Sequence, residues 1–173
     1  MQGCMSSMMD RNVELSAGLQ QLKNEHPPLL SMLDELLEVC QQIERVETTR
    51  KTMFQELIQK VKAFFHELEP HSEREEGVLF SMMEKYIGRE SGPIAVMEYE
   101  HDQAKGFIGS FLKAAESNSS YTDKEMMEHA ELIKKAYYTL VDHFAKEENV
   151  LFPMAENFFT DEEKQELKDR ISK

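Results

Sequence analysis

The chain contains one ten-residue motif twice, as HSEREEGVLF at residues 71–80 and as HFAKEENVLF at residues 143–152. In each copy a histidine is followed four positions later by a glutamate: His71 by Glu75, and His143 by Glu147. Residues i and i+4 of an α-helix lie on the same face, so each copy directs an imidazole and a carboxylate to one point. We therefore expect two helices that each supply a pair of metal ligands.

A Glu-His pair precedes each copy of the motif, so the repeat is longer than the motif itself. The first pair, at residues 25–26, lies 45 residues before its motif histidine, and the second pair, at residues 100–101, lies 42 residues before its own. Four histidines and two carboxylates are typical of a pair of octahedral iron or manganese ions bridged by carboxylates, and zinc fits such a set less well. The candidate ligands are His26, His71, Glu75, His101, His143 and Glu147.

Composition limits the classes of function. A length of 173 residues with 40% hydrophobic content is enough for one globular domain with its own core. The 33 acidic and 20 basic side chains give a formal net charge of -13. This charge repels phosphate backbones and anionic lipid surfaces, so we expect neither nucleic acid nor membrane as a partner.

The cysteine content and the hydropathy pattern predict a cytoplasmic protein. Cys4 and Cys40 have no paired spacing, which favours a reducing compartment over a disulfide framework. The sequence has no stretch of about 18 apolar residues and no basic and apolar leader at its start. We therefore expect a soluble chain without a membrane segment or a signal peptide.

Apolar residues recur at spacings of three and four, and proline and glycine are scarce, which predicts helices throughout. The expected fold is all-α: an antiparallel up-down-up-down four-helix bundle with short extra helices at the N and C termini. We expect an amphipathic helix near 8–24, long helices over about 27–46, 51–86, 93–116 and 122–153, and a final helix after Thr160. The expected domains are an N-terminal segment over 1–24, the bundle over 25–158 and a C-terminal helix over 159–173.

The expected turns test the ligand set independently of the motif. In an antiparallel hairpin two residues lie level when the turn falls midway between them. The midpoints of the ligand pairs fall near residues 48, 88 and 122, which are the three expected turns. All six candidates should therefore share one layer. Pro70 removes a backbone donor and predicts a kink, or a break and restart, just before His71.

Other polar residues near the motif are assigned from their spacing. His66 falls off the inward face, and His129 lies about four turns from His143, so neither should be a ligand. Glu67 and Glu100 are either solvated helix charges or carboxylates near a metal entrance. The second glutamates of the motif, Glu76 and Glu148, should be exposed.

These residues together resemble the hemerythrin-like, His-His-Glu cation-binding family over roughly Leu22 to Phe158. The doubled His-x-x-x-Glu-Glu-x-Val-Leu-Phe motif is specific to that family. The resemblance implies two non-haem iron ions, with manganese as the alternative, bound terminally by the four histidines and bridged by Glu75 and Glu147. Such a centre leaves positions open to water, an oxo bridge, oxygen or nitric oxide.

One departure from the family bears on function. Oxygen-carrying hemerythrins add a fifth histidine four residues after the one matching His101, where this chain has Lys105. The four-histidine set is closer to proteins proposed to repair iron-sulfur clusters, whose acidic residues match Glu67 and Glu100. Those proteins also carry a small cysteine-bearing N-terminal domain, which we do not expect here because a single cysteine precedes the bundle.

The resemblance therefore implies a role in nitrosative or oxidative stress or in iron-sulfur cluster repair. Its small ligands would be oxygen or nitric oxide, and its protein partners would be damaged iron-sulfur proteins. Reversible oxygen binding or sensing, and iron storage, remain as alternatives.

Overall fold

The computed structural model describes residues 13–118 and 120–173, and every regular element within them is a helix. The predicted all-α class is confirmed. Cys4 and residues 8–12 of the expected N-terminal helix lie outside the described residues. The helices are α1 (Ala17–Asn24), α2 (His26–Arg45), α3 (Arg50–Arg74), α4 (Phe80–Ile87), α5 (Pro93–Ser117), α6 (Asp123–Lys146), α7 (Phe152–Phe158) and α8 (Asp161–Ile171).

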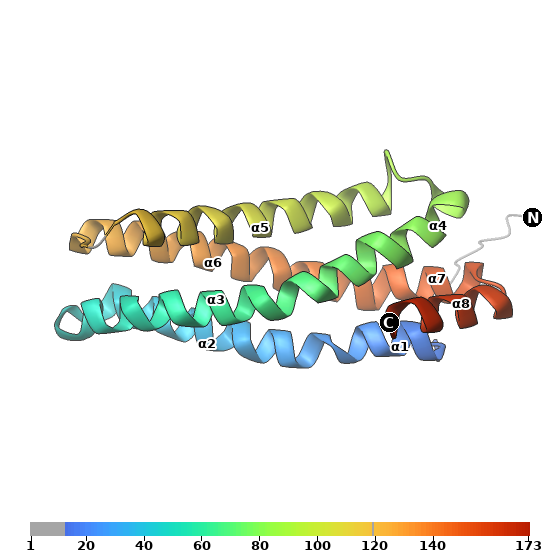
Figure 1. The fold of residues 1–173 in the computed structure, drawn as a ribbon, viewed down its shortest axis with the longest axis horizontal. Helices are drawn as coiled ribbons and strands as arrows, with labels where there is room; N and C mark the ends of the chain where they lie inside the picture. Colours follow the sequence, from blue (N-terminus) through green and yellow to red (C-terminus); the bar gives the residue numbers. More distant parts are fainter. Residues whose placement is uncertain (1–12, 119) are drawn as a thin grey trace, which may run out of the picture.

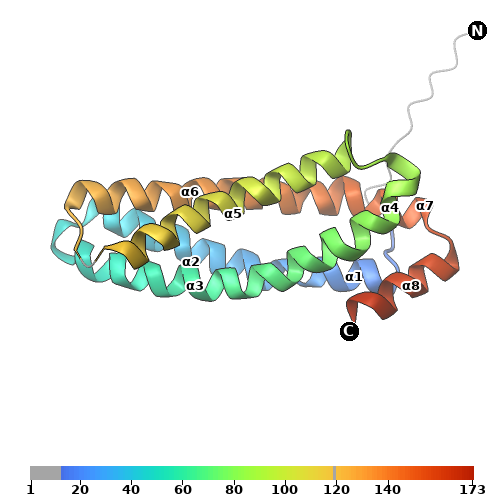
Figure 2. The same ribbon diagram turned by 45° about the horizontal axis from the view of Figure 1, so that its top comes forward.

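The four long helices α2, α3, α5 and α6 lie side by side, and each runs opposite to the one before it (Figure 1). Helix α2 packs against α3 and α6, and α5 packs against α6. A 3-10 turn (Glu47–Thr49) joins α2 to α3. The short helices α1, α4, α7 and α8 gather at one end of the molecule, where α1 and α8 pack against each other (Figure 2).

Local sequence signals explain where the helices begin. Gly88 and Gly92 have φ angles of 73° and 78°, a region that favours glycine, and they bound the turn between α4 and α5. Pro93 occupies the first position of α5, where its missing N–H costs nothing. Thr122 and Thr160 each form a capping box with the glutamate three residues later, at the starts of α6 and α8.

Each copy of the repeated motif forms a π-helical turn. The turns are η2 (Glu75–Leu79), between α3 and α4, and η3 (Glu147–Leu151), between α6 and α7. Helix α3 is continuous through Pro70, so the predicted break and restart before His71 is wrong. Pro70 lies on the exposed face, where water can hydrogen-bond the carbonyl that loses its backbone donor. The irregular turns begin at the motif glutamates instead, and π turns are frequent at functional sites.

Two apolar clusters fill the interior, one on each side of a polar layer. The larger cluster joins the four long helices and includes the fully buried rings of Phe54 and Phe111. The smaller cluster brings Leu19 of α1 and Leu167 of α8 against Phe152 at the end of the bundle. The buried histidines and glutamates lie between these clusters, so apolar side chains close the polar layer on both sides.

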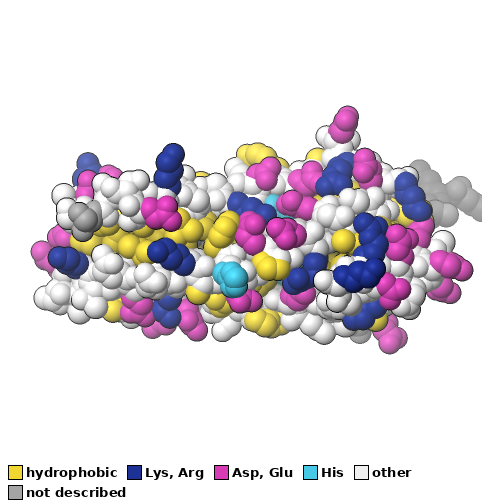
Figure 3. Space-filling model, viewed as in Figure 1, with side chains coloured by type: hydrophobic (Ala, Val, Ile, Leu, Met, Phe, Trp, Pro, Cys, Tyr) yellow, Lys and Arg dark blue, Asp and Glu magenta, His cyan; other side chains and the backbone are white. Residues whose placement is uncertain are grey.

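The surface carries acidic and basic side chains interspersed over most of the face seen in Figure 3. A band of hydrophobic side chains lies between α3 and α5 in the half of the bundle away from the termini. Within the described part of the chain, none of the helices combines the length and the apolar character that crossing a membrane requires.

Candidate metal centre

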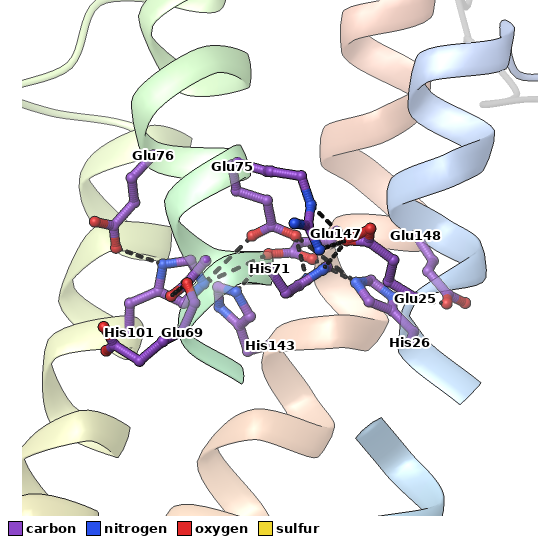
Figure 4. Close-up of polar contacts among 12 residues, drawn as sticks. Glu25, His26, Glu69, His71, Glu75, Glu76, His101, His143, Glu147 and Glu148 are labelled. Atoms are coloured by element: carbon purple, nitrogen blue, oxygen red, sulfur yellow. Dashed lines mark hydrogen bonds and ion pairs between the residues drawn. The ribbon is translucent and has the colours of Figure 1, made fainter. Parts of the chain in front are cut away.

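All six candidate ligands meet in the polar layer (Figure 4). Each long helix contributes one histidine, and each π turn contributes its first residue, a glutamate. Their exposures lie between 0% and 2%, so the layer is sealed from solvent. The contributors are His26 of α2, His71 of α3, His101 of α5, His143 of α6, Glu75 of η2 and Glu147 of η3.

The six residues form two groups that share both glutamates. One group joins the two glutamates to His26 and His71, and the other joins them to His101 and His143. Within each group, one ligand atom of every residue lies within 4.8 Å of those of the others. Each group therefore offers two imidazoles and two carboxylates to one ion, and no cysteine of the described residues belongs to either group.

Each shared glutamate presents different oxygens to the two groups. Glu75 places Oε1 2.6 Å from His71 Nε2, and it places Oε2 3.4 Å from His101 Nε2. This is the arrangement expected of a carboxylate that bridges two cations.

Glu147 repeats the pattern from the opposite helix pair. Its Oε2 lies 2.9 Å from His26 Nε2, and its Oε1 contacts His143 Nε2. The two glutamates thus each face both ligand groups across the layer.

Unpaired ligand atoms show that the site suits a metal. The Nε2 atoms of all four histidines and both oxygens of each shared glutamate are buried, and although they lie close to one another they form no hydrogen bond of regular geometry among the described residues. Buried polar atoms left unpaired are costly, and cations at the centres of the two groups would satisfy them together. Nitrogen and oxygen donors without thiolates suit iron or manganese.

The electrostatics of the layer are those of alternating charges. Burial lowers the pKa of each imidazole, but the facing carboxylates outweigh it and raise the pKa of His26 to about 9 and those of His71 and His143 to about 10. Burial would raise the pKa of Glu75, yet the surrounding imidazoles hold that pKa well below its usual range. Without metal, protons on the imidazoles balance the carboxylates, so an incoming cation must displace them.

Comparison with known proteins agrees with this geometry. The family model of the hemerythrin HHE cation binding domain matches residues 17–155. The chain belongs to this hemerythrin family. It is also similar to iron-sulfur cluster repair proteins YtfE from Salmonella schwarzengrund, Salmonella paratyphi B and Salmonella newport, at 33% identity over 129 residues. The match covers 71% of this chain but 57% of each relative, so the chain spans little more than half of their length.

Carboxylates also hold the outer nitrogens of three of the four histidines in this hemerythrin domain. His26 Nδ1 donates to Glu148 at 2.9 Å, and His101 Nδ1 donates to Glu76 at 2.7 Å. The prediction that these two glutamates are exposed is therefore wrong: their side chains are about one-third exposed and face a histidine of another helix. The doubled glutamate of the motif is the sequence signal that could have indicated this role.

Glu25, the residue before His26, has a role that its spacing in the sequence does not predict. His71 Nδ1 donates to Glu25 at 2.8 Å, and Arg74 donates to the same carboxylate oxygen. A carboxylate on the outer nitrogen fixes the ring orientation and the tautomer that leaves Nε2 free for a metal. The first Glu-His pair thus supplies a candidate ligand, His26, and a carboxylate, Glu25, that orients the ring of His71.

The two glutamates expected near a metal entrance lie in different environments. Glu100 is buried beside the layer, with Oε2 3.7 Å from His143 Nδ1 and Oε1 bound to Lys146. Glu67 is exposed on α3 and lies outside both ligand groups. Its role at an entrance stays a prediction.

The remaining polar residues are as expected. His66 is exposed on α3. His129 packs against Phe54 in the larger apolar cluster, away from the polar layer. Lys105 forms an ion pair with Glu69 at 3.3 Å rather than supplying an imidazole to the layer.

Proposed function

We propose that residues 25–158 form an antiparallel up-down-up-down bundle whose purpose is to hold two non-haem iron ions. Manganese is the alternative metal, because it accepts the same nitrogen and oxygen donors. Residues 1–24 and 159–173 flank this unit in the proposal. The proposed ligands are His26 and His71 for one ion, His101 and His143 for the other, and Glu75 and Glu147 as bridges.

The division of both glutamates between two ligand groups is the observation that carries this proposal. A single ion would leave two histidines and two carboxylate oxygens buried without partners. Once bound, an iron pair supplies open coordination positions for small ligands such as oxygen or nitric oxide, and iron that can be lent to a damaged cluster. The chain's own residues orient the ions and exclude bulk water from them.

We further propose that the protein acts in the response to nitrosative or oxidative stress by repairing iron-sulfur clusters. The similarity to proteins named for that repair supports this role, although the chain spans only 57% of their length. The proposed partners are damaged iron-sulfur proteins, and the proposed compartment is the cytoplasm.

The proposal is tested by adding the iron-loaded protein to an iron-sulfur enzyme inactivated with nitric oxide. We expect two irons per chain and recovery of enzyme activity. The matched control is the Glu75→Ala, Glu147→Ala double variant, which lacks both bridges and should restore nothing. Absence of recovery with the fully loaded protein would remove the repair role.

Reversible oxygen binding is the second candidate, favoured by the aromatic rings around the ligands. The ring of His26 stacks on Phe144 at 4.3 Å and on Phe152 at 5.7 Å, and His101 stacks on Phe80 at 6.0 Å. Such an apolar lining suits a small uncharged molecule. Stopped-flow mixing of the reduced, iron-loaded protein with oxygen separates the two roles. A spectral change that argon reverses favours oxygen binding, and rapid irreversible oxidation opposes it.

A further inference from the structure

The two halves of the repeat hold their motif histidines differently. In the first half, His71 Nδ1 donates to Glu25 at 2.8 Å. In the second half, the equivalent carboxylate oxygen of Glu100 lies 3.7 Å from His143 Nδ1, beyond hydrogen-bonding distance. His143 Nδ1 is buried and has no hydrogen-bond partner among the described residues. Among the residues that the structure describes, His143 is therefore the one proposed ligand histidine whose outer nitrogen no carboxylate holds.

The cations beside these carboxylates account for the difference. Arg74 and Lys146 occupy equivalent positions, three residues after their motif histidines. Arg74 donates from Nε at 3.2 Å and from Nη2 at 3.0 Å to the Glu25 oxygen that also accepts from His71. The planar guanidinium and the imidazole therefore share one oxygen.

Lys146 acts on its carboxylate in another direction. Its Nζ donates to Glu100 Oε1 at 2.8 Å, whereas Oε2 is the oxygen nearer to His143. The Lys146 side chain is 52% exposed, so its compact ammonium draws the carboxylate toward the surface. Glu100 thus hydrogen-bonds to Lys146 and not to His143.

We propose that Lys146 is a positioning residue that keeps Glu100 out of reach of His143, so that the His101 and His143 position releases its metal ion first. This inference rests on the proposed function, because it requires two bound ions. A carboxylate on the outer nitrogen orients the ring and raises its basicity, and losing it typically costs roughly 10–100-fold in metal affinity. One ion is therefore retained while the other is available for transfer.

Iron release from the full-length protein tests the inference. The anaerobic protein, loaded with Fe²⁺, is mixed with an excess of a coloured ferrous chelator, and absorbance is followed in a stopped-flow instrument. We expect two phases of one iron each, with rates that differ roughly 10–100-fold. The His143→Gln variant should lose the fast phase and keep the slow one.

Variants at equivalent positions of the repeat provide the contrast. Lys146→Gln frees Glu100 to accept a hydrogen bond from His143, so the rate of the fast phase should fall toward the rate of the slow phase. Glu25→Gln should accelerate the slow phase roughly 10–100-fold, whereas Glu100→Gln should leave the fast phase nearly unchanged. Lys134→Gln is the matched control, because it removes a lysine of α6 that pairs with Glu44 away from the centre. Its release should match that of the unaltered protein.

The possible failures are distinct. Two irons released in a single phase, or a fast phase that Lys146→Gln does not slow, would overturn the inference and leave the two-iron centre standing. Binding of fewer than two irons by the unaltered protein would instead remove the proposed function, and the inference with it.

Discussion

Replacing Glu147 with alanine removes one of the two carboxylates that face both ligand groups. In the metal-free protein, the Nε2 atoms of His26 and His143 then lose their closest carboxylate contact, in a layer where both residues are 0% exposed. Burial lowers the pKa of both imidazoles, but neighbouring carboxylates raise the pKa of His26 to about 9 and that of His143 to about 10. Glu147 makes the largest contribution to both increases. The variant therefore leaves buried positive charge without its main partner.

The expected cost follows from this loss. Removing one partner of a buried ion pair costs about 3–5 kcal/mol. The raised pKa of His143 agrees in order of magnitude, because a shift from 6.5 to about 10 corresponds to about 5 kcal/mol of interaction. We therefore expect Glu147→Ala to lower the free energy of unfolding of the metal-free protein by about 3–5 kcal/mol. It should also lower the metal content below two ions per chain.

Urea denaturation followed by circular dichroism measures the first effect, and elemental analysis measures the second. The control is Glu131→Ala, which truncates an exposed glutamate on the same helix and should change stability by no more than about 0.5 kcal/mol. An unchanged unfolding midpoint together with two bound ions in Glu147→Ala would refute the reasoning. The same result in Glu75→Ala would show that neither carboxylate bridges.

Three further predictions concern pH, packing and thiol chemistry. The imidazoles of His26, His71 and His143 have pKa values raised from 6.5 to about 9 or 10, so their stabilising charge is complete below about pH 6.5 and is lost as the pH rises through 9 to 10. The melting temperature of the metal-free protein should therefore fall over that pH interval, and a flat or rising profile would contradict this. Gly18→Ala should destabilise the protein by about 1–3 kcal/mol, because the added Cβ would lie 2.9 Å from Leu167 Cγ. Helix α8 should then be cleaved more readily by a protease, and cleavage as slow as in the unaltered protein would argue against this close approach. Burial raises the pKa of Cys40 to about 12. In a Cys4→Ser variant, a thiol reagent should therefore label Cys40 only after denaturation, and rapid labelling of the folded variant would contradict this prediction.

The repeated spacing explains why so much could be predicted from the sequence. An interval of four residues fixes a shared helical face, so His71 with Glu75, and His143 with Glu147, could be paired without knowledge of the tertiary structure. The turn at Gly88 and the capping box at Thr122 were equally local signals. These features depend only on residues a few positions apart.

The errors arose where the outcome depends on the neighbouring helix. Glu148 reaches His26 across 122 positions in the sequence, and helical spacing alone does not specify which helix a partly exposed glutamate faces. Pro70 predicts a kink, or a break and restart, and only the break is contradicted, because the exposed position of Pro70 lets α3 continue. The different placements of Glu25 and Glu100 depend on whether arginine or lysine lies beside them, which spacing does not indicate.

Mössbauer spectroscopy of the protein loaded with ⁵⁷Fe, combined with iron analysis, tests the shared-glutamate centre most directly. Two irons joined by carboxylates should be present in each chain, and their magnetic moments should be coupled in an applied field at low temperature. A single iron per chain, or two irons that behave as magnetically isolated ions, would contradict a centre bridged by Glu75 and Glu147.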